Sequence, residues 1–148
     1  MKKASIKVRL ILYNKGKILL LKQRKKQGGN YTLVGGTVDA NEFALDALVR
    51  ESEEEAGIIL KEENMQLVHV LHKHTRFGAH RVTLYFKATK WKGELRTGEP
   101  SKFKGVSWFA LDNLPANLSA TVRHVLLQYR EGHLYSEFTN PKPMKAGS

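Results

Sequence analysis

Acidic residues gather in one short segment of a chain that is otherwise basic. Six of the fourteen Asp and Glu residues fall within residues 42–55, although the 148-residue chain has a formal net charge of +11. Like charges four residues apart on a helix destabilise it by about 0.2–0.5 kcal/mol per pair, and burial makes their repulsion stronger. A divalent cation offsets that repulsion. The segment is therefore a candidate metal-binding site.

The spacing of the glutamates places three carboxylates on one side of a helix. At about 100° per residue, Glu55 lies about 40° from Glu51, and Glu54 lies about 60° from it in the opposite sense. Glu53 points away from this side, and we expect it to face solvent. Apolar residues continue the same side towards the helix N-terminus, so the carboxylates extend a face that turns inward. Oxygen ligands in a chain without cysteine favour Mg²⁺, with Mn²⁺ as the alternative.

The alternative for such a helix is a solvent-exposed row of glutamates paired with lysines. No lysine lies between Lys26 and Lys61, which disfavours this alternative. The cation within the segment is Arg50, which stands four residues before Glu54 and can orient it through a charge-assisted hydrogen bond. We therefore expect Arg50 to hold the glutamates in position.

Strands and helices must position these residues. Apolar patterns predict strands at residues 5–13, 17–23, 31–34, 65–75, 80–89 and 105–111. Helical patterns cover residues 42–56 and 120–130, with Asp39 or Asn41 as the N-cap of the first helix and Gly57 as its stop. This mixture predicts the α/β class, with a mixed sheet and helices packed on its faces.

The composition narrows the class of protein. The absence of cysteine excludes disulfide scaffolds and thiol catalysis, and it fits a reducing cytoplasm, where we expect the protein to act. No apolar run of about 18 residues predicts a transmembrane helix, so we expect no membrane association. No linker or repeat divides the chain. We expect one domain over residues 1–139 and a disordered tail over residues 140–148.

Histidines show a weaker pattern. His72 and His74 share one face of the strand predicted at residues 65–75. Two imidazoles can bind a metal, but no further ligand stands at a matching spacing, so we interpret the pair as part of a polar sheet face. We expect His80 to take no part in any constellation.

The segment around the glutamates resembles a known signature. Gly36, five residues, Glu42, seven residues and then residues 50–58 are similar to the signature of the Nudix hydrolases, and eight of its nine fixed positions are met. The departure is Ser52, where the family usually has an aliphatic residue. Just outside the signature, Val34 replaces the proline of many members. Ser52 is small, so we expect looser packing there and undisturbed carboxylates.

The resemblance implies a Nudix-type α/β/α sandwich with a central mixed sheet and a catalytic loop–helix–loop. It also implies a metal shell to which a backbone carbonyl of the glycine pair and an acid on a later loop contribute. Glu99 is the best-placed later acid. The expected metal ligands are Gly35, Glu51, Glu54, Glu55 and Glu99.

The resemblance also implies roles in the reaction. Glu51 and Glu54 are expected to be catalytic together with Arg50, and Glu51 is either a ligand or the general base that takes a proton from water. Arg24 follows the second predicted strand, where a basic residue often meets the phosphates. Gly36 is expected to let the substrate approach the backbone closely.

The expected function is Mg-dependent hydrolysis of a nucleoside triphosphate, or a modified one, to the monophosphate and pyrophosphate. The first alternative is a dinucleoside polyphosphate or a 5′-triphosphorylated RNA end, which the net charge of +11 favours. The second is a non-catalytic nucleotide sensor, which has no need of three clustered carboxylates. The expected partners are a small nucleotide and nucleic acid only as a 5′ RNA end, and the expected state is a monomer or a homodimer.

Overall fold

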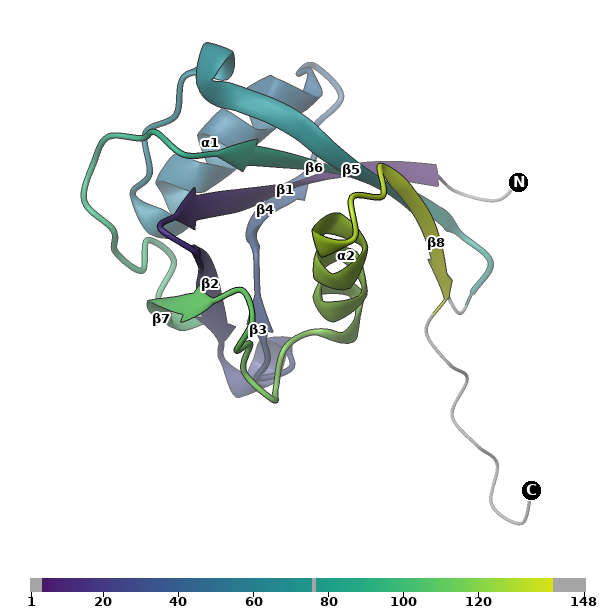
Figure 1. The fold of residues 1–148 in the computed structure, drawn as a ribbon. Helices are drawn as coiled ribbons and strands as arrows, with labels where there is room; N and C mark the ends of the chain where they lie inside the picture. The colour runs from purple at the N-terminus through teal and green to yellow at the C-terminus, as the bar shows by residue number, and fades with distance from the viewer. Residues whose placement is uncertain (1–3, 76, 140–148) are drawn as a thin grey trace.

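The sheet of this protein is built around its first strand, as the computed structural model shows for residues 4–75 and 77–139 (Figure 1). The elements are β1 (Ala4–Asn14), β2 (Lys17–Gln23), β3 (Tyr31–Thr32), β4 (Val34–Thr37), α1 (Ala44–Ala56), β5 (Met65–His74), β6 (His80–Ala88), β7 (Phe103–Ala110), α2 (Ala120–Arg130) and β8 (Tyr135–Thr139). Short 3-10 helices lie at Lys25–Gln27 and Glu62–Asn64. The tail expected at residues 140–148 lies outside the described residues.

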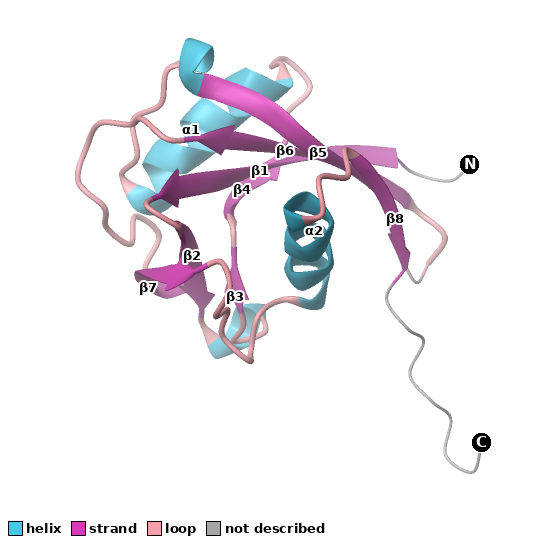
Figure 2. Ribbon diagram, in the orientation of Figure 1, coloured by secondary structure: helices cyan, strands magenta, loops and turns pink. Residues whose placement is uncertain are grey.

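The strands form one eight-stranded mixed sheet. Its order is β3-β2-β1-β6-β5-β8, and β4 and β7 pair with β1 and β2 respectively. β1 runs parallel to β6 and antiparallel to β4. β5 runs antiparallel to β6 and parallel to β8. The predicted mixed sheet is confirmed, and Figure 2 shows α1 and α2 on its two sides.

Alternation along β1 divides its side chains between two cores. Val8, Leu10 and Leu12 face α1 and pack in the same buried cluster as Leu48. Ile11 faces the other way, into the cluster that includes the buried residues of α2. The expected α/β/α layering is therefore present, and β1 passes through its centre.

The first turn of α1 differs from the sequence prediction. The helix begins at Ala44 rather than at residue 42, and Phe43, with φ −86° and ψ 166°, is its N-cap residue. The Asp46 carboxylate accepts a hydrogen bond from the Phe43 amide at 3.0 Å. The expected N-caps, Asp39 and Asn41, were wrong, because the bond from the Phe43 amide to Asp46 fixes the start of the helix two or more residues further on.

The last strand, β8, was not predicted. Its five residues are mostly polar and half-exposed or exposed, so they show no apolar run. Pairing with β5 over the register Val70↔Tyr135 to His74↔Thr139 holds them in place. Neither helix in the described part of the chain is long and apolar enough to span a bilayer.

Candidate metal centre

Three carboxylates meet at the C-terminal half of α1. Glu51, Glu55 and Glu99 each offer an oxygen within 4.8 Å of the others. The two helix residues lie one turn apart, and Glu99 comes from the loop before β7. Oxygen donors gathered in this way fit a hard divalent ion such as Mg²⁺.

Backbone hydrogen bonds bring Glu99 to the helix. The amides of Arg96 and Gly98 donate to carbonyl oxygens of the last turn of α1 at 3.0 and 2.9 Å. A Cβ atom at Gly98 would lie 1.9 Å from the carbonyl oxygen of Glu54, so only glycine permits this approach. The loop thus satisfies helix carbonyls that have no partner within α1 and delivers the third carboxylate.

The paired glycines of β4 lie directly against two of the carboxylates. The Gly35 amide donates to Oε1 of Glu55 at 2.8 Å, and a Cβ atom at Gly35, where φ is +151°, would lie 2.0 Å from the carbonyl oxygen of Val8. A Cβ atom at Gly36 would lie 2.5 Å from Oε1 of Glu51. Gly35 therefore lets β4 lie close to the backbone of β1, and Gly36 leaves space for the Glu51 carboxylate.

Burial shifts the carboxyl groups towards their neutral forms. Glu55 is 5% exposed, and burial raises its pKa to about 7, against the opposing effects of the Gly35 amide and Arg9. Burial also raises the pKa of Glu51, against the hydrogen bond from Arg50. Two acids that ionise poorly beside each other fit a site that a cation completes.

Arg50 connects the acids of the signature. Its guanidinium donates to both carboxylate oxygens of Glu42, at 2.7 and 3.2 Å, and to Oε1 of Glu51 at 3.0 Å. It also donates to Glu54 at 3.4 Å, as the spacing predicted. A planar guanidinium suits such a forked contact, so Arg50 fixes the orientation of these side chains.

Two other predicted residues lie outside the group of three carboxylates. Glu54 is 51% exposed, and its carboxylate bonds to Arg50 at the helix surface. Arg24 is exposed and donates through Nε to the carbonyl of Pro100, so it is bound to the loop that carries Glu99. Glu53 faces solvent, as expected.

A cavity lies on the α2 side of the sheet, and the charge of Arg9 in its lining acts on Glu55. Four cations line the cavity: Lys7, Arg9, Lys73 and Arg81. Arg9 pairs with Gly35 across β1 and β4, which joins the cavity to the glycine loop. The buried Nε of Arg81 has no hydrogen-bond partner among the described residues. Burial, followed by the charges of the other three cations, lowers the pKa of Lys7 to about 8.

Sequence reasoning missed these cations. Lys7 and Arg9 stand two apart in an apolar strand, so they share one face, and that spacing was the available signal. Lys73 and Arg81 join them only through pairing of β5, β6 and β1, with Lys73 opposite Arg81 in the ladder. Four cations around one cavity make a site for an anionic group.

The chain is similar to known proteins in sequence and in fold. The sequence profile of the NUDIX domain matches residues 3–129. The crystal structure of a MutT NUDIX hydrolase from Burkholderia pseudomallei is similar with 35% identity and a TM-score of 0.76, over 86% of this chain and 98% of that one.

Curated relatives are similar over part of their length. An ADP-ribose pyrophosphatase from Methanocaldococcus jannaschii is 33% identical over 71% of this chain, and the NAD-capped RNA hydrolase NudC from Photorhabdus laumondii is 32% identical over 66%. The chain spans 61% and 36% of these two proteins respectively. With the profile match over most of its length, the chain belongs to the Nudix hydrolase family.

Proposed function

We propose that this protein is a Mg²⁺-dependent pyrophosphohydrolase that cleaves a nucleoside triphosphate, or a modified one, to the monophosphate and pyrophosphate. The observation that carries the proposal is that two cations lining the cavity act on the carboxylate group, since the charge of Arg9 opposes the rise in the pKa of Glu55 and the charge of Glu51 opposes the fall in the pKa of Lys7. Glu51, Glu55 and Glu99 would hold the metal that the reaction needs, and the four cations of the cavity would hold the negative charge of a phosphate chain.

The metal centre supplies the chemistry of phosphoryl transfer. A bound divalent ion neutralises charge on the phosphates and lowers the pKa of a water molecule. Glu51, Glu55 and Glu99 would hold it, because their oxygens already lie within 4.8 Å of one another. Mn²⁺ fits the same oxygen donors.

The remaining signature residues support this centre. Glu54 is half-exposed and accessible to water, so it would complete the metal shell from the solvent side or take the proton of the attacking water. Glu51 would likewise be either a metal ligand or the general base that takes a proton from water. The Gly35 carbonyl would add a ligand, and Gly36 would let a phosphate approach the backbone. Arg50 would orient the acids.

The lining of the cavity favours phosphate over a base. A stacked base needs an exposed aromatic face, and Tyr85, the aromatic residue in the lining, is 2% exposed. An anion would give the buried Nε of Arg81 a partner and would stabilise the charged form of Lys7, whose pKa burial lowers to about 8. We assign the cavity to the phosphates that leave as pyrophosphate, and Arg24, which is exposed and bonded to the loop that carries Glu99, would contact the substrate from that loop.

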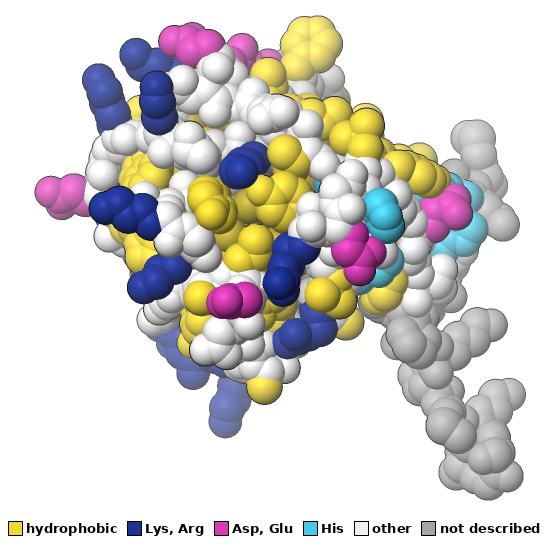
Figure 3. Space-filling view, in the orientation of Figure 1, with side chains coloured by type: hydrophobic (Ala, Val, Ile, Leu, Met, Phe, Trp, Pro, Cys, Tyr) yellow, Lys and Arg dark blue, Asp and Glu magenta, His cyan; other side chains and the backbone are white. Residues whose placement is uncertain are grey.

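A longer polyanion is the second candidate substrate. The net charge of +11 favours a dinucleoside polyphosphate or a 5′-triphosphorylated RNA end, and Figure 3 shows Lys and Arg side chains spread over the visible face. A non-catalytic sensor fits less well, because a protein that only binds gains nothing from buried carboxylates that ionise poorly. We place the activity in the cytoplasm.

The test is a substrate panel with identification of products. Nucleoside triphosphates, ADP-ribose, a dinucleoside polyphosphate and 5′-triphosphorylated RNA are incubated with the full chain and Mg²⁺ or Mn²⁺. We expect pyrophosphate from the triphosphates and the highest kcat/KM for one of them. A much higher kcat/KM for ADP-ribose, or no turnover of any compound, would overturn the proposal.

A matched pair of variants tests the metal centre in the same assay. Glu51→Gln should lower kcat by at least about a hundredfold, because it removes a negative charge from the centre. Glu53→Gln changes the same residue type two positions away on the solvent side of α1 and should leave kcat unchanged. Equal activity of the two variants would show that the centre is wrongly assigned.

A further inference from the structure

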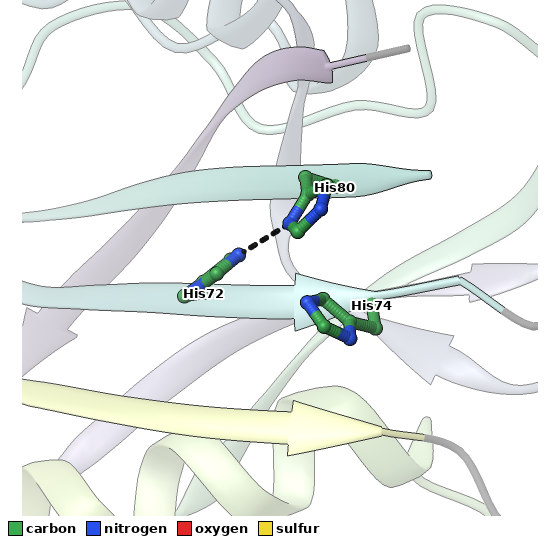
Figure 4. Close-up of side chains that lie close together, drawn as sticks. All are labelled: His72, His74 and His80. Carbon is green, nitrogen blue, oxygen red and sulfur yellow. Dashed lines mark hydrogen bonds between the residues drawn. The ribbon is translucent and has the colours of Figure 1, made fainter. Parts of the chain in front are cut away.

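Three histidines gather at the turn end of the β5–β6 hairpin (Figure 4). His74 is the last residue of β5 and His80 the first of β6, and the two are directly opposite in the ladder. His72 lies two residues before His74 on the same face. Each of the three offers a ring nitrogen within 4.8 Å of the others. The expectation that His80 joins no constellation was wrong, because strand pairing brings it beside the other two.

A hydrogen bond joins two of the three rings, and a small opening of this bond would admit a shared ion. Nε2 of His72 and Nδ1 of His80 are 2.9 Å apart. Two nitrogens bound to one tetrahedral zinc at about 2.0–2.1 Å lie about 3.3–3.4 Å from each other, so the pair must open by only about half an ångström. The His74 ring is nearly perpendicular to that of His80, at 86° with 4.4 Å between centroids, so it approaches from another direction.

We propose that His72, His74 and His80 bind one first-row transition-metal ion of the Zn²⁺ class. Imidazole nitrogen suits zinc, copper and nickel, whereas Mg²⁺ prefers oxygen, so this site selects a different metal from the carboxylate centre. Three imidazoles leave one coordination position of a tetrahedral ion for water or a further ligand.

A carboxylate lies beside the histidines. Glu137 of β8 is opposite His72 in the parallel ladder and lines the same surface cavity as His72 and His74. The Tyr135 hydroxyl donates to Oε2 of Glu137 at 2.9 Å, which orients the carboxylate. Figure 3 shows histidine and acidic side chains reaching the surface together at this end of the molecule. A nearby negative charge favours a bound cation, and Glu137 is the candidate for the fourth position.

The histidine site is separate from the carboxylate centre. His80 is opposite Ala4 on β1, whereas the glycines of the carboxylate centre are opposite Val8 and Arg9. Four to five residues of strand correspond to about 13–17 Å. An ion at the histidines therefore joins β5 to β6 across their turn and stands away from the proposed reaction.

The experiment uses the full chain, stripped of metal and then supplied with excess Mg²⁺ to fill the carboxylate centre. Zn²⁺ is titrated by calorimetry, and we expect one equivalent to bind. His74→Gln and His80→Gln should each weaken Zn²⁺ binding at least about tenfold. The control His133→Gln removes an exposed histidine outside the cluster and should leave the affinity unchanged. Unchanged affinity in the double variant His74→Gln/His80→Gln would overturn the proposal.

Two further measurements locate the bound ion. Glu51→Gln should keep the Zn²⁺ affinity, and its loss there would assign the ion to the carboxylate centre and overturn the proposal. Co²⁺ bound to the unmodified chain should give the visible absorption of a four-coordinate, nitrogen-ligated ion. A purely octahedral oxygen-ligated spectrum would contradict the site independently of any variant.

Discussion

The backbone of Gly36 lies against the carboxylate of Glu51, which leaves no space for a side chain at position 36. A Cβ atom on Gly36 would lie 2.5 Å from Oε1 of Glu51 and 2.7 Å from its carboxyl carbon. The strand that precedes the helix therefore touches the carboxylate by its bare backbone. The position of the Glu51 carboxylate therefore depends on position 36 as well as on its own helix.

Gly36→Ala should displace the Glu51 carboxylate and lower kcat by about a hundredfold, since small displacements of catalytic groups have large effects on rate. Stability should change little, because the far end of a side chain can move aside. The measurement is steady-state kinetics beside thermal unfolding. Gly105→Ala is the control, since a Cβ atom there meets nothing within 4 Å. Unchanged kcat in Gly36→Ala would contradict this account.

Glu55→Gln should stabilise the metal-free protein near neutral pH. Burial raises the pKa of Glu55 from 4.5 to about 7, so between these values the folded state binds more protons than the unfolded state. The free energy of unfolding of the native protein should therefore fall as pH rises from about 4.5 through 7, by an amount of order 3 kcal/mol at most. This fall should be absent in Glu55→Gln, because glutamine does not titrate. Urea unfolding in chelator, from pH 5 to 8, measures the difference.

In excess Mg²⁺ the native protein should instead be more stable than Glu55→Gln. The ion binds the ionised carboxylate of the native protein more tightly than the amide of the variant, and tighter binding to the folded state raises the free energy of unfolding. Glu53→Gln, on the exposed side of the helix, should follow the native curve throughout. Parallel pH curves for the native protein and Glu55→Gln would show that Glu55 is not held in its neutral form.

Ser52→Ala should stabilise the protein by about 1 kcal/mol or more. The Ser52 side chain is fully buried in α1, and its hydroxyl has no hydrogen-bond partner within residues 4–75 and 77–139. A buried, unsatisfied hydroxyl costs about 1–3 kcal/mol, and alanine is also the better helix former. Denaturant unfolding measures the gain, and kcat should stay unchanged. A less stable Ser52→Ala protein would show that the hydroxyl is satisfied.

Pyrophosphate binding should weaken as pH rises from 7 to 9. The pKa of Lys7 is lowered to about 8, so the lysine loses its charge over this range, while a bound anion favours the charged form. The affinity of the native protein should fall about tenfold more than that of Lys7→Arg, which stays charged. Calorimetry with Mg²⁺ at each pH gives the dissociation constants. Lys104→Arg, at an exposed lysine, should behave as native, and matching profiles for Lys7→Arg would contradict the prediction.

The sequence predicted side-chain positions best for the glutamates of α1, which all lie on one helix. Helical geometry placed Glu51 and Glu55 together and excluded Glu53, because those relations depend on spacing within one element. Glu99 was predicted as a metal ligand only from the family resemblance, because its local sequence does not indicate which part of the fold its loop contacts. The start of α1 was wrong because the bond between Phe43 and Asp46 fixes it, and Phe43 carries no capping side chain.

Side-chain clusters that depend on strand register could not be predicted from the sequence. The cationic cavity needs β5, β6 and β1 aligned so that Lys73, Arg81 and Lys7 face the same space. The same register brings His80 to His74. A shift by one residue would turn each of these side chains to the opposite face, and no local pattern in the chain determines that alignment.

The loop that carries Glu99 is attached to α1 through backbone groups. Its amides at Arg96 and Gly98 bond to helix carbonyls, and the close approach at Gly98 requires only that this residue stay glycine. Side chains at neighbouring positions such as Glu94 and Thr97 take no part in these backbone bonds, so substitutions there should leave the third carboxylate in place. The loop can thus present different side chains around the carboxylates while its attachment to the helix stays the same.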